Sequence, residues 1–158
     1  MSRSLSELLA RRLIERVPVL LGPRDQQYRQ LFWTKEVSRW LDDYSDLPTR
    51  SLVSLPLQAN QAFADFISGR PMTGMTKCDP PAGEGVWKLK TPDLRIFGWA
   101  FDINAMILGG IELKRTLLAP GPPKDKHVGK AVVLVRRRLL FDGFITGEIF
   151  SVFPKAPS

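Results

Sequence analysis

GVWKLKTPDLRIFGWAFDINAMILGGIEL, residues 85–113, is the stretch of sequence that decides the fold. It contains three strand signals, at Val86–Thr91, Leu94–Phe101 and Ala105–Leu113. They are separated only by turn-forming residues, Pro92-Asp93 and Asp102-Ile103-Asn104. Connections this short cannot join parallel neighbours, so the three strands are predicted to be antiparallel. The last strand is almost wholly apolar and should lie in the centre of a sheet.

The first of these strands combines an apolar face with a basic one. Lys88 and Lys90 are two residues apart, so both side chains point to one face, while Trp87 and Leu89 point to the other. Arg95 follows five residues after Lys90. Cations this close together repel one another unless a negative group lies between them, and a phosphate is the obvious partner. Trp87 is expected in the core, although an exposed ring could also stack on a base.

Length and charge set the outer limits. The chain has 158 residues, 44% of them hydrophobic, which suits one domain with a substantial core. Of the net charge of +7, residues 1–85 carry +1 and residues 86–158 carry +6. This asymmetry favours a localised site for a polyanion, although a solvated basic surface with no partner explains the charge alone equally well.

No feature suggests an oxidising compartment or a membrane. Cys78 is the single cysteine and cannot form an intramolecular disulfide. Charged residues interrupt the segment where a secretory signal would be apolar, and no stretch approaches the roughly 18 apolar residues of a membrane span. A cytoplasmic protein is therefore expected.

The N-terminal half is predicted to be mainly helical. Ser4 and Glu7 form a capping-box pattern before a helix from about Leu5 to Arg16. Gln30–Thr34 is predicted to be a short strand and Lys35–Tyr44 a helix. A second helix is predicted to open at Pro48 and to run, with a break near Pro56, to Gly69. A loop rich in Gly, Pro and Thr should follow from Arg70 to Gly85.

The segment Lys124–Phe141 is ambiguous from local pattern alone. Val128, Val132, Val135 and Leu139 fit one face of a helix, whereas the run from Val132 to Val135 has high strand propensity. Asp142-Gly143 could also turn a hairpin.

The order of these elements resembles the RelE/HigB group of bacterial toxins within the RelE/ParE superfamily. The resemblance covers roughly Gln30 to Phe141 and is one of layout and local pattern. Gly85–Lys90 resembles the family's aromatic-Lys-apolar-Lys strand, and Leu94-Arg95-Ile96 its arginine-bearing strand. Ile111–Thr116 resembles the basic end of the last strand, and Pro120–Lys130 the loop and basic helix that follow, which favours a helix for the ambiguous segment.

The resemblance implies an α+β fold: a small RelE-like domain with N-terminal helices packed on an antiparallel-rich sheet of about four strands and a basic C-terminal helix. The toxin domain would span residues 30–142, between an N-terminal helical extension, 1–29, and a C-terminal tail, 143–158. The implied activity is that of an mRNA endoribonuclease acting on ribosome-bound mRNA. The implied partners are mRNA, the ribosome and an antitoxin with a helix-turn-helix or ribbon DNA-binding domain.

The family's site residues carry over onto positions that match. The expected catalytic residues are Lys88, Lys90, Arg95, Arg115 and His127, and the expected RNA-binding residues are Lys114, Lys124, Lys126, Lys130 and Arg137. Lys114 is an alternative to Arg115. The family's late general acid/base is often a Tyr, His or Lys in the last segment. No Tyr follows Tyr44 here, so His127 or Lys126 would take this role.

The chemistry that these residues suit needs neither metal nor cofactor. Internal RNA cleavage removes the proton of a 2′-hydroxyl, which attacks the adjacent phosphorus while the 5′-oxygen leaves. Clustered cations stabilise the charge that develops on the phosphoryl oxygens. A lysine crowded by other cations can give up its proton and serve as the base.

Two other functions fit the sequence. A ParE-like toxin shares the fold but inhibits DNA gyrase, and the Lys-x-Lys and Arg pattern speaks against it. A non-catalytic phage or mobile-element protein that binds nucleic acid or another partner through its basic face is a different class. The missing Tyr and the N-terminal extension favour that second alternative.

Overall fold

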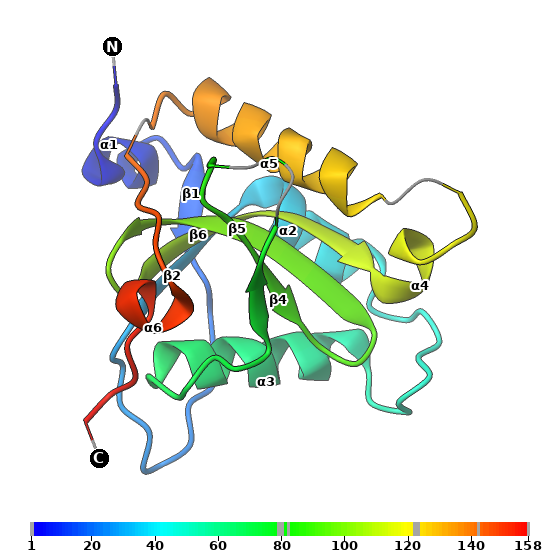
Figure 1. The fold of residues 1–158 in the computed structure, drawn as a ribbon. Helices are drawn as coiled ribbons and strands as arrows, with labels where there is room; N and C mark the ends of the chain where they lie inside the picture. The colour runs from blue at the N-terminus through cyan, green and yellow to red at the C-terminus, as the bar shows by residue number, and fades with distance from the viewer. Residues whose placement is uncertain (1, 79–80, 82, 122–123, 142, 158) are drawn as a thin grey trace.

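The computed structural model describes residues 2–78, 81, 83–121, 124–141 and 143–157 and shows an α+β fold. Over these residues six helices surround one six-stranded mixed sheet with the strand order β1-β2-β6-β5-β4-β3 (Figure 1). The strands are β1 Ile14–Arg16, β2 Gln30–Thr34, β3 Met75–Lys77, β4 Val86–Lys90, β5 Leu94–Asp102 and β6 Ala105–Leu113. The helices are α1 Leu5–Ala10, α2 Lys35–Asp43, α3 Leu55–Ile67, α4 Lys114–Leu117, α5 Asp125–Arg138 and α6 Ile149–Val152.

Helices cover both faces of the sheet and create two hydrophobic clusters. The α3 face packs Leu55, Phe63 and Phe66 against sheet residues such as Met106. The α5 face packs Val132 and other α5 side chains against the opposite side of the same strands. Figure 1 shows α5 above the sheet and α3 below it. The alternation of side chains along β5 and β6 feeds both clusters, so these strands are apolar on both sides.

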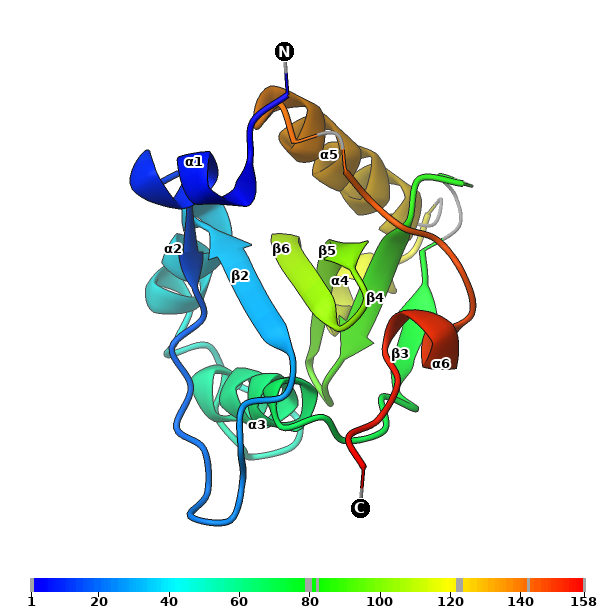
Figure 2. The ribbon, with the colours of Figure 1, turned by 90° about the vertical axis from the view of Figure 1, so that its left-hand side faces the viewer.

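One parallel pair makes the sheet mixed. β2 lies beside β6 with Gln30 opposite Ala105 and Trp33 opposite Leu108, while every other neighbouring pair is antiparallel. Figure 2 shows β2 next to β6, with β5 and β4 beyond. A parallel partner requires a long connection, which here includes α2, α3 and the β3–β4–β5 meander. β2 therefore pairs with β6, the strand that follows the meander.

The prediction of about four strands is wrong because two short edge strands extend the sheet. The predicted helix Leu5–Arg16 ends at Ala10, where Arg12 takes a left-handed backbone conformation with φ of 55°, and Ile14–Arg16 becomes β1. The predicted loop Arg70–Gly85 contains β3, which pairs with β4. Both strands have three residues, too few for a periodic pattern to be visible in the sequence.

The longer elements follow the sequence pattern closely. The predicted strand Gln30–Thr34 is confirmed, Ala105–Leu113 is a central strand as expected, and the segment from Asp125 to Arg138 is a helix. The second helix of the N-terminal half begins at Leu55, not at Pro48, because Ser54 caps it and Pro56 lies in its first turn. Pro56 therefore starts this helix and does not break it.

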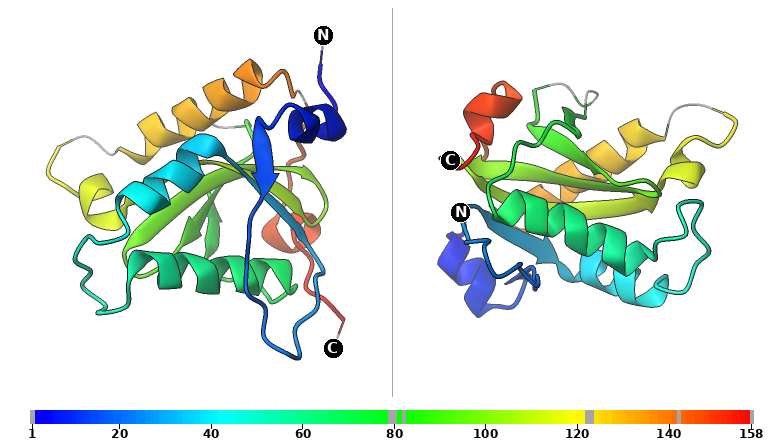
Figure 3. Two further views of the ribbon diagram at one scale, coloured as in Figure 1. Left: turned by 180° about the vertical axis from the view of Figure 1, so that it is seen from behind. Right: turned by 90° about the horizontal axis from the view of Figure 1, so that it is seen from below.

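The segment 143–157 runs from the α5 face of the sheet to the α3 face, where its last residues lie beside the end of α3 (Figure 3). The Ile145 N–H donates to Ala100 O at 2.9 Å and the Ala156 N–H to Gly69 O at 2.8 Å. Val152 and Phe153 are buried in the α3-face cluster. Arg29, which is 0% exposed, fixes this segment by donating to Phe153 O and Pro154 O at 3.2 and 3.0 Å.

Within the described part of the chain, no helix combines the length and the apolar character needed to cross a membrane.

Candidate functional site

The structure places three of the predicted catalytic cations on one face of β4 and β5. Lys88 and Lys90 share a face of β4, and Lys90 lies directly opposite Arg95 in the antiparallel register. This is the face that α5 partly covers, since Lys88 lies opposite Phe97, a member of the α5-face cluster. Lys90 is exposed, and Lys88 and Arg95 are half-buried. We call Lys88, Lys90 and Arg95 the basic trio.

Two carboxylates accompany the basic trio. Asp125, in the first turn of α5, forms an ion pair with the Lys88 ammonium group. Glu112 on β6 is the register partner of Arg95, so its side chain emerges on the same face of the sheet. The trio is therefore a partly compensated cluster, and an arriving phosphate would compete with Asp125 for Lys88.

The Arg95 guanidinium is held by backbone oxygens. Its Nη1 donates to Thr91 O at 2.7 Å and to Leu94 O at 2.8 Å. Partial burial lowers the pKa of Arg95 below its ordinary value, and the nearby charge of Asp125 opposes that shift. Because both of these bonds use one nitrogen, the remaining donors of the fork stay available for an oxyanion.

A polar network fixes the β4–β5 turn that carries the trio. The buried Gln58 side chain of α3 donates to Asp93 Oδ2 at 2.8 Å and accepts from the Thr91 hydroxyl at 2.7 Å. The Ser51 hydroxyl also donates to Asp93, at 3.0 Å. Burial alone would raise the pKa of Asp93, but the hydrogen bonds from Gln58, Arg50 N–H and Ser51 lower it below 3.8.

Lys114 and Arg115 lie at the far end of β6, in the short helix α4. The Lys114 N–H donates to Asp93 O at 2.8 Å, which keeps α4 against the β4–β5 turn. The exposed Arg115 side chain instead donates to Pro48 O at 3.1 Å, in the loop before α3. Arg115 is thus engaged with that loop. In the described structure no hydrogen bond or ion pair joins it to the basic trio.

His127 lies in a separate groove. Together with Trp40 of α2 and Gly109-Gly110 of β6, it lines an open depression of about 360 Å³ between α2 and α5. Two helical positions separate His127 from Asp125, so the two side chains leave α5 in widely different directions, about 200° apart. The structure therefore does not bring His127 to the side of α5 where Asp125 meets Lys88.

The predicted RNA-binding residues of α5 form a solvent-facing stripe. Lys126, Lys130 and Arg137 are exposed and recur at offsets of four and seven residues, which places them on one side of the helix. Lys124 is half-buried and immediately precedes α5. Arg137 approaches Glu84 Oε1 at 3.4 Å. The stripe adds positive charge beside the half-covered sheet face.

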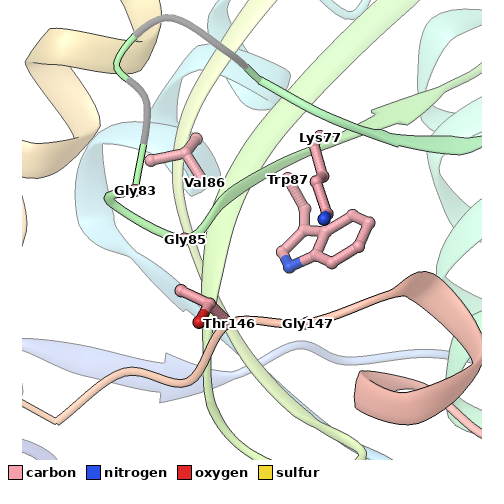
Figure 4. Close-up of a pocket in the computed structure, with 7 residues that line it drawn as sticks. All are labelled: Lys77, Gly83, Gly85, Val86, Trp87, Thr146 and Gly147. Carbon is pink, nitrogen blue, oxygen red and sulfur yellow. The ribbon is translucent and has the colours of Figure 1, made fainter.

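A smaller pocket lies between the start of β4 and the segment 143–157 (Figure 4). It has a volume of about 90 Å³ and is lined by Lys77, Trp87, Thr146 and three glycines. Trp87 is only 2% exposed and packs edge-on against Phe153 with ring centroids 5.3 Å apart. Its ring belongs to the core and offers no open face on which a base could stack.

Sequence reasoning missed the carboxylates that accompany the trio. Glu112 could have been found from the alternation Ile111-Glu112-Leu113, which turns it away from the α3-face cluster that holds both neighbours. Asp125 carried a weaker signal, an acidic residue at the start of a helix. Among the described residues, no group of three or more His, Cys, Asp or Glu side chains is placed to hold a metal ion.

Comparisons of the chain with protein-family models, with curated proteins and with solved structures give no match.

Proposed function

We propose that this protein is a RelE/HigB-like toxin that cleaves mRNA by a metal-independent attack of the 2′-hydroxyl, acting in the cytoplasm on ribosome-bound message. The observation that carries the proposal is the basic trio on a half-covered sheet face beside the exposed cations of α5. An antitoxin that covers this face would be its natural partner.

The order of elements supports the same proposal. The segment β2-α2-α3-β4-β5-β6-α5 follows the layout of the toxin family, a strand, two helices, three antiparallel strands and a basic helix. The lysine pair and the arginine occupy neighbouring register positions at the β4–β5 hairpin. β1 and β3 would then be additions at the two edges of the family sheet.

The chemistry assigns separate tasks to the three cations. Arg95 and Lys90 would bind the phosphoryl oxygens and stabilise their developing charge. The phosphate would displace Lys88 from Asp125, and the freed Asp125 carboxylate could then accept the 2′-hydroxyl proton. The 2′-oxygen attacks phosphorus, the bond to the 5′-oxygen breaks, and the Lys88 ammonium group donates a proton to that oxygen, leaving a 2′,3′-cyclic phosphate.

A non-catalytic nucleic-acid-binding protein is the second candidate. The observation that favours it is the compensation of the trio by Asp125, together with the position of His127 in a different groove. A surface that binds RNA without cleaving it needs only the trio and the α5 stripe. The test must therefore separate cleavage from affinity.

Expression in bacteria with primer extension on translated mRNA provides that test. The wild type should arrest growth and produce discrete cleavage ends. Replacement of Lys88, Lys90 or Arg95 by Ala should lower the cleavage rate by about 10²–10³ if that group stabilises the transition state. Each substitution should weaken RNA binding only modestly and lower the slope of log affinity against log salt concentration by about 1.

A charge-matched control separates the site from general basicity. A quadruple Ala variant of the exposed residues Arg11, Arg24, Arg39 and Lys155 loses the same charge and should cleave like the wild type. A folded K88A/K90A/R95A/R115A variant that cuts at the wild-type rate would contradict the site. A wild type that binds RNA but cuts nothing, with or without ribosomes, would favour the binding protein, and gyrase inhibition without cleavage would favour the ParE-like alternative.

A further inference from the structure

A second basic cavity lies at the opposite end of α5 from the basic trio. It has a volume of about 230 Å³ and is bounded by the segment before α1, the α1–β1 turn, the start of α2 and the end of α5. Its lining includes four cations, Arg3, Arg12, Lys35 and Arg138. Glu36 is the one carboxylate among the residues that line it. The proposed cleavage reaction uses none of these groups.

The four cations are not used elsewhere in the described structure. No ion pair or side-chain hydrogen bond joins Arg3, Arg12, Lys35 or Arg138 to another described residue. The neighbouring Arg136, by contrast, is buried and pairs with Glu84 at 2.5 Å. Cations brought together without counter-charges repel one another, and an anion in the cavity would remove that cost.

A buried hydroxyl without a partner lines the same cavity. Thr34 is 2% exposed, and its Oγ1 has no hydrogen-bond partner among the described residues. Burying a hydroxyl without a partner costs free energy, so such groups are rare in native structures. A ligand oxygen in the cavity would give the Thr34 hydroxyl an acceptor.

Thr34 is also the N-cap residue of α2, and its side chain does not cap the helix. The first N–H groups of a helix lack intrahelical acceptors, and they present partial positive charge at this end. A Thr at this position ordinarily accepts from one of them. In α2 the capping hydroxyl and the backbone donors are both left to an outside partner.

We propose that this cavity is a phosphate-binding site formed by Thr34, the α2 N-terminus and the four cations. Phosphate suits it better than a carboxylate because it carries about −1.5 to −2 charge near pH 7 and three acceptor oxygens. Guanidinium groups bind such oxygens in forked pairs, and helix N-termini are recurrent phosphate sites. The ligand is a phosphate group, carried either by a nucleic acid or by a small phosphomonoester.

Calorimetric titration of the full chain with inorganic phosphate, at constant ionic strength, tests the site. The wild type should show one saturable site for phosphate that chloride does not fill. Arg138→Gln should raise the dissociation constant roughly tenfold or more, because hydrogen bonds to charged groups are among the strong ones. Glu36→Gln should lower it severalfold by removing the opposing carboxylate. A wild type that binds no phosphate would overturn the proposal.

Thr34→Val separates a ligand role from a structural one. The valine methyl replaces a hydroxyl that has no partner, so the melting temperature without phosphate should stay equal or rise. Phosphate affinity should nevertheless fall. The matched control is Arg39→Gln, an exposed arginine of α2 outside the cavity, which should bind phosphate like the wild type. Equal phosphate affinity in Thr34→Val, Arg138→Gln and the control would place the anion elsewhere and refute the site.

Competition with RNA then identifies the source of the phosphate. If the site takes an RNA end, a 5′-phosphorylated oligonucleotide should displace inorganic phosphate and the 5′-hydroxyl form should not. Equal displacement by both forms would assign the site to the sugar-phosphate backbone. Displacement by neither would assign it to a small phosphomonoester.

Discussion

Arg29 and Arg95 show two ways in which this fold accommodates a guanidinium group. Arg29 is fully buried at the corner where α3, the β5–β6 turn and the segment 143–157 meet, and its donors reach Asn104 Oδ1 and four backbone oxygens. Arg95 is half-buried on the β4–β5 face and uses one nitrogen for two backbone oxygens. All the side-chain N–H groups of Arg29 have acceptors, whereas several N–H groups of Arg95 remain available.

The electrostatics of Arg29 follow from that complete set of neutral partners. Burial removes water from the guanidinium and lowers the pKa of Arg29 to about 10, and the nearby Tyr28 opposes the shift. None of the five oxygens that accept hydrogen bonds from the Arg29 side chain in the described structure belongs to a carboxylate. The Arg29 corner therefore serves stability, whereas the basic trio and the α5 stripe keep their charges near the surface, where a polyanion can reach them.

Arg29→Met should have the largest effect on stability. It leaves five buried or half-buried acceptors without donors, and removal of such a buried charged group typically destabilises by about 3–5 kcal/mol. Urea unfolding followed by circular dichroism measures the change. Arg24→Met, at an exposed loop position, should change the free energy of unfolding by less than about 0.5 kcal/mol. Similar values for the two variants would remove the distinction between the two kinds of arginine.

Asp93→Asn should give a smaller loss that depends on pH. Since the pKa of Asp93 lies below 3.8 in the folded chain, its carboxylate stabilises the fold above that pH. This contribution is lost as the pH falls through the folded-state value. The gap between wild type and variant in thermal unfolding should therefore be present at neutral pH and shrink as the pH falls below the ordinary carboxyl value of 3.8 and through the lower folded-state pKa. A gap that stays constant down to pH 2 would show that the charge is not what matters.

Asp125→Asn tests whether the basic trio is restrained by its own carboxylate. The Lys88–Asp125 pair is partly exposed, so its loss should cost at most about 1 kcal/mol of stability. RNA affinity at low salt should rise, because Lys88 is released and one negative charge is removed. Filter binding over a range of salt concentrations measures this, and weaker RNA binding by a folded variant would contradict the expected competition.

Replacing both Lys126 and Lys130 by Ala should leave stability within about 0.5 kcal/mol of the wild type. The same variant should lower the slope of log affinity against log salt by about 2 if both lysines contact phosphates. An unchanged slope would exclude the α5 stripe from the RNA-binding surface while leaving the trio in place.

Sequence pattern was sufficient where an element is long and its burial is regular. The strands from Val86 to Leu113 and the helix after Thr34, α2, were predicted because alternation or helical periodicity extends over five or more residues. The four-residue helices α4 and α6 were not predicted. β1 and β3 could not be predicted in this way, since three residues carry no periodic signal and their pairing is set by neighbours distant in sequence.

In the candidate site, too, only the contacts between neighbours in sequence could be predicted. The register that places Lys90 opposite Arg95 follows from the tight turn at Pro92-Asp93, so those cations could be grouped from the sequence. Asp125 reaches Lys88 only because α5 packs across the sheet, a tertiary contact over 37 residues. Thr34 could not be recognised as unpartnered, because Thr before a helix ordinarily indicates a cap.

The dispersed partners of Arg29 have a consequence for synthesis on the ribosome. Its acceptors come from residues 66, 70, 104, 153 and 154, and the strand that follows it pairs with residues 105–108. A nascent chain therefore carries the apolar residues Leu31–Trp33 without β6, one of the two strands that pair with β2, until β6 has emerged. Arg29 remains incompletely paired for longer still. Until β6 leaves the exit tunnel, the growing polypeptide should depend on chaperones to keep this apolar strand from aggregating.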